Sequence, residues 1–410
     1  MSSTFRSLKY RNARLFFAGL AISNVGTWLQ LTAMSLLVYR LTGEATTVGI
    51  SIAFQFLPTL LLGAWAGVIA DGRDRRTLAI VTQSALAAQA LVLGGLDLAG
   101  MVNLPVVYAM SLVLGVVNAF DNPARRGLVT ELVPTADISN ATSLNTAVMT
   151  GSRIFGPALA AGLVSAVGTA WCFIFNGITF FAIIFSLVAI RPHEMFPAPR
   201  RAKGGKPIRE ALRFVAGHPD MVVIYTLLVI ISMVAFNQAT VFPKLADTRW
   251  GSAESFGVVL AVMSIGSLSG SLLTARLGQV TMRWFFWCIV VMALTGFGLA
   301  WAPNLALALV WSIPFGLGAA GFIAGANAIT QQECPPDMRS RLLALQAVAF
   351  LGSTPIGGPL TGLIADNISP EWALAYSSVV SLVCVAVAVP YWQSRRRRAA
   401  DLVPAPEPAR

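Results

Sequence analysis

Long stretches without any charged residue constrain this chain more than any other feature. Uncharged runs cover residues 15–39, 45–70, 77–96, 98–120, 221–243, 255–275, 342–365 and 372–394. Two longer stretches, 138–190 with only Arg153 inside it and 284–332, are long enough to fold back once, near residues 167–170 and 301–304. Because a helix of about 20 apolar residues spans a bilayer, these runs predict twelve transmembrane helices.

The composition indicates that the protein lies in lipid, and this limits the fold class. Only 11% of the residues are charged, whereas a soluble domain carries roughly a quarter. Backbone groups in hydrocarbon must bond within a helix or a closed barrel, and the two-residue alternation of a barrel strand is absent. We therefore expect an all-α integral membrane protein whose twelve helices form two pseudo-symmetric six-helix bundles.

The positions of Lys and Arg predict the orientation. With the N-terminus in the cytoplasm, all but four of the 29 basic residues fall in inner segments; Arg40, Lys244 and Arg249 lie outside, and Arg153 lies within a span. The positive-inside rule then places both termini in the cytoplasm. The net charge of +11 reflects this rule and contact with anionic headgroups, so no nucleic-acid partner is expected.

Cysteine and histidine give no sign of metal or enzyme chemistry. Cys172, Cys288 and Cys384 stand alone in predicted spans, and Cys334 lies near an inner end, so their spacing suggests neither a metal site nor a disulfide framework. Both histidines fall in the central loop, and no nucleophile and base recur at useful spacing. We expect no cofactor, no metal and no enzymatic activity.

The longest polar segment divides the chain. We expect an N-terminal bundle over residues 1–190, a cytoplasmic linker over 191–220, a C-terminal bundle over 221–394 and a basic, disordered cytoplasmic tail over 395–410. In the linker, Ile208, Leu212 and Val215 have helical spacing, as in a short amphipathic helix lying on the membrane surface.

A faint repeat relates the two halves. With an offset of 200, residues 129–163 fall on residues 329–363, and both segments lead from a turn with Pro and Asp into a span. We expect Gly156-Pro157 and Gly357-Gly358-Pro359 to break these two spans.

One short charged motif identifies a family resemblance. "GVIADGRDRR" is similar to G-x-x-x-D-R-x-G-R-R, the loop between helices 2 and 3 of the major facilitator superfamily: Gly67, Asp71, Arg75 and Arg76 match, and Arg73 substitutes for a displaced arginine. "FDNPARRGLVTELVP", "GPALAAGLV" and "REALRFVAGHPDM" resemble the transmembrane secretion branch that includes the enterobactin exporter and macrolide efflux proteins. The resemblance covers about residues 10–393.

The resemblance implies that the motif is a cytoplasmic gating latch. Asp71 would accept hydrogen bonds from an arginine or a helix N-terminus of the other half while the inner side is closed, and Gly67 would permit close helix approach. The alternative is that Arg73, Arg75 and Arg76 only set topology.

Arg153 is the single charge expected near the middle of a span. An arginine at that depth costs about 2.5 to 3.5 kcal/mol on insertion scales, so it needs a partner or water. Asp121 and Glu131, near the inner end of helix 4, are the candidates for either a proton-coupling site or a static buried ion pair with Arg153.

Uncharged polar residues predict a substrate cavity, and the resemblance implies that helices 1, 4, 7 and 10 line it. Each of these residues could instead bond between helices. The candidates are Asn24, Thr27, Trp28, Gln30, Gln55, Asn118, Asn237, Gln238 and Asn327.

Such a cavity suits a bulky neutral or amphipathic solute. We expect a monomeric secondary active transporter of the bacterial cytoplasmic (inner) membrane, in contact with lipids, that exports drugs, macrolides or siderophores in exchange for protons. An uptake symporter or facilitator on the same fold, and a sensor or scaffold that transports nothing, are the alternatives.

Overall fold

Helices make up almost the whole molecule in the computed structural model, which describes residues 3–196, 207–335 and 338–401. Within these ranges, twelve helical segments are long and apolar enough to cross a membrane. The prediction of twelve spans is therefore confirmed. Two of the spans are each built from two helices, which separate at Phe236–Asn237 and at Gly352–Ser353.

The first bundle holds six helices, each of which is one span. A 3-10 turn (Ser3–Lys9) precedes it. Its helices are α1 (Arg11–Thr42), α2 (Ala45–Gly72), α3 (Arg75–Leu98), α4 (Leu104–Glu131), α5 (Ile138–Val167) and α6 (Thr169–Ala189).

The linker and the second bundle follow. The linker contains helix α7 (Pro207–Gly217), where the spacing of apolar residues predicts a short helix. The second bundle comprises α8 (Pro219–Ala235), α9 (Gln238–Arg249), α10 (Ser255–Arg276), α11 (Met282–Ala300), α12 (Leu305–Glu333), α13 (Arg339–Leu351), α14 (Thr354–Asn367) and α15 (Pro370–Asp401).

The expected helix breaks at Gly-Pro pairs are wrong. Helix α5 continues through Gly156 and Pro157, and α14 continues through residues 357–359. These glycines instead allow close packing: a Cβ at Gly156 would fall against Trp28 and Leu29 of α1, and one at Gly358 would lie 3.1 Å from the Gly49 carbonyl oxygen. A backbone in lipid keeps its helical bonds where it can, so the small residues serve contact between helices.

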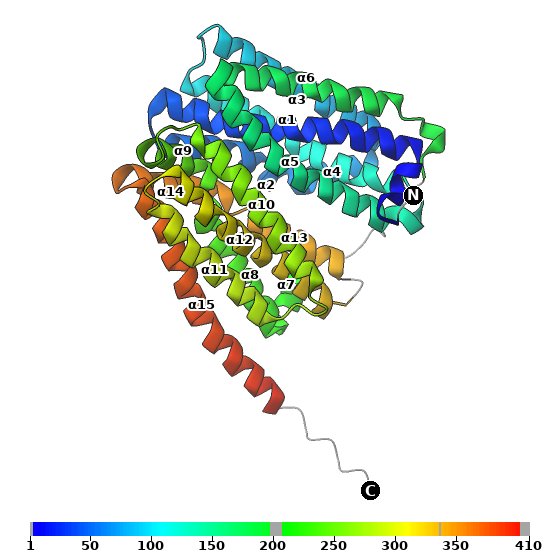
Figure 1. Cartoon of the computed structure of the whole chain (residues 1–410). Helices are drawn as coiled ribbons and strands as arrows, with labels where there is room; N and C mark the ends of the chain where they lie inside the picture. The colour runs from blue at the N-terminus through cyan, green and yellow to red at the C-terminus, as the bar shows by residue number, and fades with distance from the viewer. Residues whose placement is uncertain (1–2, 197–206, 336–337, 402–410) are drawn as a thin grey trace.

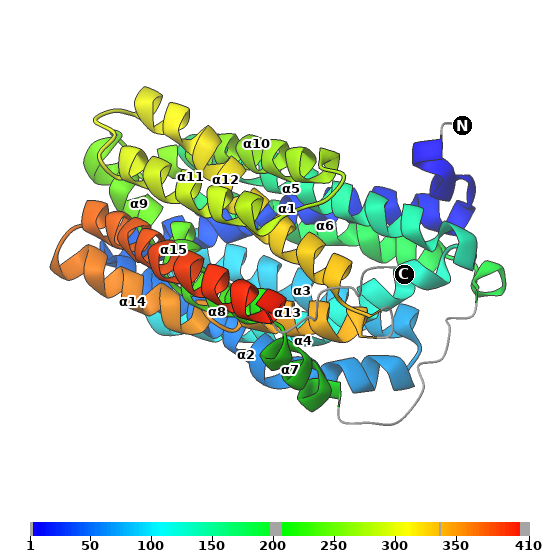
Figure 2. The same ribbon diagram turned by 90° about the horizontal axis from the view of Figure 1, so that it is seen from below.

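The turns distinguish two sides of the molecule. The four described glycines with positive φ, Gly43, Gly100, Gly168 and Gly251, all lie in connections that follow an odd-numbered span, on what we call the far side. The opposite, terminus side holds the N-terminal turn, the α2–α3 connection and α7 (Figures 1 and 2). Glycine reaches left-handed φ without a Cβ clash, which suits such short turns.

The two bundles meet at the far side. Figure 1 shows them converging near α9 and α14 and diverging toward the end that carries the N-terminus. Helix α14 packs along α2, whereas α13, the terminus-side half of the same span, barely touches α2. The second contact joins α5 to α10, where a Cβ at Gly257 would lie 2.6 Å from the Pro157 carbonyl oxygen.

The last helix extends beyond the predicted span. Helix α15 continues to Asp401, so residues 395–401 are helical, contrary to the expectation of disorder from 395. Arg396 donates to Asp220 of α8 at 3.0 Å and stacks over Trp392, whose Nε1 donates to the same carboxylate at 2.9 Å. These contacts join the end of α15 to α8. Residues 402–410 of the predicted tail lie outside the described part.

Candidate functional site

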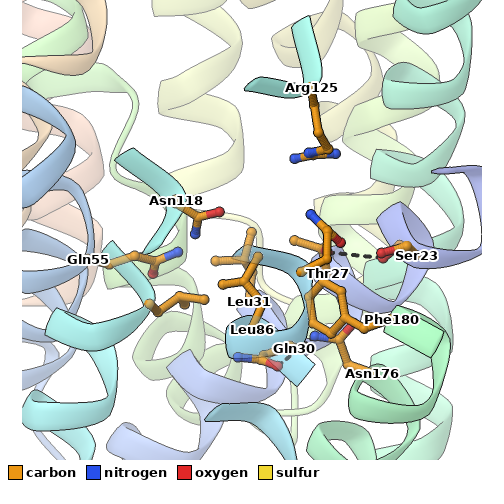
Figure 3. A pocket seen from close by; sticks show the side chains of 12 residues that line it. Ser23, Thr27, Gln30, Leu31, Gln55, Leu86, Asn118, Arg125, Asn176 and Phe180 are labelled. Atoms are coloured by element: carbon orange, nitrogen blue, oxygen red, sulfur yellow. Dashed lines mark hydrogen bonds between the residues drawn. The ribbon is translucent and has the colours of Figure 1, made fainter. Parts of the chain in front are cut away.

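A small polar cavity lies inside the first bundle, between helices α1, α2, α3, α4 and α6 (Figure 3). Its volume is about 30 Å³, which suits one or two water molecules, whereas drug-sized sites need about 300 to 1,000 Å³. The cavity is therefore a place for water and not for a bulky solute. Its walls are formed by Ser23, Thr27, Gln30, Leu31, Gln55, Gln83, Leu86, Leu114, Asn118, Arg125, Asn176 and Phe180.

Asp121 lies beside this cavity, and three side chains donate hydrogen bonds to its carboxylate. The residue has no exposed surface. Its Oδ1 accepts from Thr82 Oγ1 and from Gln83 Nε2, both at 2.8 Å, and its Oδ2 accepts from Arg125 Nε at 2.5 Å. Figure 3 shows the Arg125 side chain pointing into the cavity, so the counter-charge of the carboxylate borders the space where water would sit.

The expected pairing of Arg153 with Asp121 or Glu131 is wrong. Asp121 pairs with Arg125, one helical turn away on α4, and Glu131 pairs with Arg75 of α3 at 2.8 Å. Residues four apart share one face of a helix, so Arg125 reaches Asp121 without crossing to another helix. The sequence alone places Arg125 only among the basic residues of an inner segment.

Arg153 lies between the bundles instead. Its guanidinium stacks on Trp28 of α1, with its carbon 4.8 Å from the ring centroid. Pro157 has no N–H, which frees the Arg153 carbonyl four residues earlier. Ser264 Oγ of α10 donates to that carbonyl at 3.0 Å, so the second bundle supplies the missing bond.

Two of the predicted cavity residues of the first bundle, Asn24 and Gln30, make contacts between helices, and Thr27 bonds within its own helix. Asn24 Nδ2 lies 2.8 Å from Met149 Sδ, Thr27 donates to the Ser23 carbonyl, and Gln30 bonds both Gln89 and Asn176. Of the nine predicted residues, four border the small cavity: Thr27, Gln30, Gln55 and Asn118.

The predicted cavity residues of the second bundle lie apart from that site. Asn237 sits at the break between α8 and α9 and donates to the Met233 carbonyl at 2.6 Å and to Thr361 at 3.0 Å. Gln238 donates to the Ala235 carbonyl, and Asn327 lies half-buried within α12. They do not join the polar cavity of the first bundle.

The charged motif makes contacts within the first bundle. Arg76 donates to the carbonyls of Leu187 and Val188 at 2.7 and 2.9 Å and so caps the end of α6. Asp74 caps the start of α3, and the Thr77 N–H lowers the pKa of this carboxyl. Arg73 is exposed, and a Cβ at Gly67 would meet no described atom within 4 Å.

The contacts named above for Arg76 and Asp74 stay within the first bundle. Arg75 binds Glu131 of its own bundle, and the Asp71 side chain lies outside the described part of the structure. The latch remains a prediction for a conformation in which the terminus side is closed.

An aspartate that the sequence did not single out joins the bundles at the far side. Asp366, at the end of α14, accepts from the backbone N–H groups of Ala45 and Thr46 at 2.9 and 2.7 Å and from Thr46 Oγ1 at 2.6 Å. Helix α2 begins at Ala45 and has no side-chain cap of its own. Asp366 thus supplies an N-terminal cap to a helix of the other bundle, where a carboxylate also opposes the helix dipole.

Other polar contacts accompany this cap. Lys244 of α9 donates to Asp366 at 2.6 Å within the second bundle, and Tyr39 of α1 donates to Asp247 of α9 at 2.9 Å across the bundles. No local pattern links positions so far apart in the chain, so only the fold reveals this network.

Comparisons with known proteins agree with this architecture. The family model described as "Transmembrane secretion effector" matches residues 2–409. The chain is similar to macrolide efflux protein A of Streptococcus pyogenes, with 24% identity over 93% of this chain and 97% of that protein. It is 23% identical to the staphyloferrin A transporter of Staphylococcus aureus, over 69% of this chain and 72% of that one.

Solved structures share the fold. A D-xylose-proton symporter superposes with a TM-score of 0.73 at 14% identity, covering 93% of this chain and 97% of that chain. A bacterial homologue of the lysosomal transporter Spinster gives a TM-score of 0.69, also at 14% identity, over 96% and 99%. At this identity the likeness establishes the fold alone.

Proposed function

This chain belongs to the transmembrane secretion effector family of the major facilitator superfamily, and on that premise we propose that it exports small amphipathic molecules across a bacterial cytoplasmic membrane in exchange for protons. The description of the family and the similarity to a macrolide efflux protein support export. Siderophores are a second substrate class, supported by the similarity to a siderophore transporter.

The proposed orientation rests on the placement of the basic residues in the fold. Among the basic residues in the described part of the chain, only Arg40, Lys244 and Arg249 fall on the far side. The positive-inside rule counts Lys and Arg themselves, so this side is the one that faces away from the cytoplasm. We therefore assign the far side to the outside of the cell and the terminus side to the cytoplasm.

The observation that carries the proposal is the unequal contact between the bundles. They are joined at the far side by the Asp366 cap and the glycine contacts of α2 with α14, and α13 barely touches α2 on the terminus side. With the far side outside, this is a conformation that receives a solute from the cytoplasm. Rocking of the bundles would break the far-side contacts and release the solute outside.

Asp121 is the proposed carrier of the coupling proton. It is fully buried, Arg125 balances its charge, and the adjacent cavity has room for water. Because Arg125 lies on the same helix, rocking of the bundles alone does not separate the pair; if the Arg125 side chain turns into the cavity as the bundles move, the buried carboxylate loses its counter-charge, and proton uptake relieves the loss. Gln83 Oε1, buried beside Asp121 with no partner among the described atoms, offers an acceptor to a water molecule that would deliver the proton.

Transport in vesicles tests both parts of the proposal. Everted vesicles should accumulate a labelled macrolide when acidified inside, because protons leave as the macrolide enters, whereas an uptake symporter would accumulate it in right-side-out vesicles acidified outside. In proteoliposomes, Asp121→Asn should abolish gradient-driven transport and keep exchange of labelled for unlabelled macrolide. Asp97→Asn, which removes a carboxylate bound only within the first bundle, is the control and should keep both. Gradient-driven transport by Asp121→Asn would exclude the coupling role.

A further inference from the structure

The guanidinium of Arg153 has no acidic partner among the described residues. Its recorded contact is with the ring of Trp28, and the residue is exposed although it lies at the middle of α5. Every basic residue on the far side has a carboxylate at 3 Å or less. An uncompensated arginine at mid-span depth is rare and marks a functional site, because it must face water or a partner.

The side chain points toward the other bundle and away from lipid. Phe155 and Leu159 form an exposed apolar stripe on α5. At about 100° per residue, Arg153 lies roughly 160° around the helix from Phe155. Two positions one turn along the helix confirm the direction: Gly156 packs on α1 and Pro157 on α10, so Arg153 projects between helices of the two bundles.

A polar track leads from Arg153 to the terminus side. Met149, Thr146 and Thr142 precede Arg153 by one, two and three turns on the same face, and all three are exposed. Exposed threonines on the face opposite the apolar stripe indicate that water reaches this side of α5. A solute entering from the terminus side would meet Arg153 where α5 and α10 begin to touch.

We propose that Arg153 binds the anionic group of the transported molecule, so that amphipathic carboxylates are the preferred substrate class. This inference rests on the proposed export function and narrows its substrate. The guanidinium offers paired N–H donors that match a carboxylate, and the ring of Trp28 holds its plane in place. Apolar parts of the solute would contact exposed side chains such as Met149.

The Arg153 site also contacts both bundles, so a bound ligand can affect the contact between them. The carbonyl of Arg153 is held by Ser264 of α10, so the residue that meets the anion is also joined to the other bundle through its backbone. A ligand that moves α5 at this point therefore acts on the α5–α10 contact directly.

Two probes that differ by one charge test the assignment: dansyl-phenylalanine, which carries a carboxylate, and dansyl-phenylalaninamide, which is neutral. Binding to the purified full chain in detergent is measured by equilibrium dialysis. We expect the wild type to bind the carboxylate at least tenfold more tightly than the amide. Arg153→Gln should remove this preference while leaving amide binding within about twofold, and Arg153→Lys should retain part of it.

Controls separate the inference from folding and from the transport function. Arg209→Gln removes an exposed cation on α7 and should keep the preference; thermal unfolding of each variant checks that it is folded. A wild type without preference for the carboxylate, or equal weakening of both probes in folded Arg153→Gln, would overturn the inference. So would competition by phosphatidylglycerol equal to that by the probe, since the site would then hold lipid. Macrolide export by Arg153→Gln proteoliposomes reports separately on the proposed function.

Discussion

Removal of the Asp366 carboxylate should open the far side. In the Asp366→Ala variant, helix α2 loses the cap on its first two N–H groups and the bond from Thr46 Oγ1. A helix cap contributes about 1 kcal/mol, and a charge at a helix N-terminus adds about 0.3 to 1 kcal/mol. The Asp366 side chain is only 16% exposed, so water compensates little, and we expect about 2 kcal/mol in total.

This figure concerns the balance between two conformations. The ion pair between Lys244 and Asp366 lies within the second bundle. The variant loses it in both conformations alike, so it does not contribute to the free-energy difference between them. Since 1.4 kcal/mol is a factor of ten, the variant should shift the ratio of far-side-open to far-side-closed molecules about thirtyfold.

Spin labels on the far side measure the shift. Met101 of the first bundle and Ile368 of the second are both exposed, and cysteines there, in a background without the four native cysteines, report their separation by double electron–electron resonance. Asp366→Ala should enlarge a long-distance population that is minor in the unsubstituted background. The control Asp97→Ala removes a far-side carboxylate bound only within the first bundle and should leave the distances unchanged. Identical distributions in Asp366→Ala and the control would refute the role of the cap.

Three further changes probe other contacts. Gly49→Val would place a Cβ 2.5 Å from the Gly358 carbonyl oxygen, so the far-side distance should lengthen as in Asp366→Ala. Arg75→Gln leaves Glu131, 19% exposed, without its cation, and should lower stability by about 1 to 3 kcal/mol, measured by thermal unfolding. Asp71→Asn should weaken the predicted cytoplasmic latch and reduce the far-side-open population; an increase would count against the latch.

Much of the architecture could be predicted from the sequence because its cause is local. Uncharged runs long enough to span a bilayer, and the charged connections between them, correspond to the twelve spans. The helix breaks could not be placed in the same way. Proline and glycine at 156–157 and 357–359 suggest a break locally, but the bundle uses them for close contact, and the observed break lies at Gly352–Ser353.

Among the polar sites, too, some follow from local sequence and others only from the packing of the helices. Asp121 stands out in the sequence as an acid near a span end, and its i,i+4 partner Arg125 could have been found by helical spacing. For Arg153 the sequence predicts an acidic partner, because a guanidinium in lipid is costly, but in the fold the guanidinium lies on the ring of Trp28, at an exposed position between the bundles that only the docking of the helices defines. The Asp366 cap spans about 320 positions and follows only from the way the bundles dock.

The central claim is that the bundles separate alternately at the two sides. The decisive measurement adds a second label pair on the terminus side, at Thr135 and Gln279, which are exposed in different bundles. Both distances are then recorded in the otherwise unsubstituted, Asp366→Ala and Asp71→Asn backgrounds. The account predicts that whatever lengthens the far-side distance shortens the terminus-side distance, and the reverse. Distances that lengthen together, or a terminus-side distance that never changes, would contradict it.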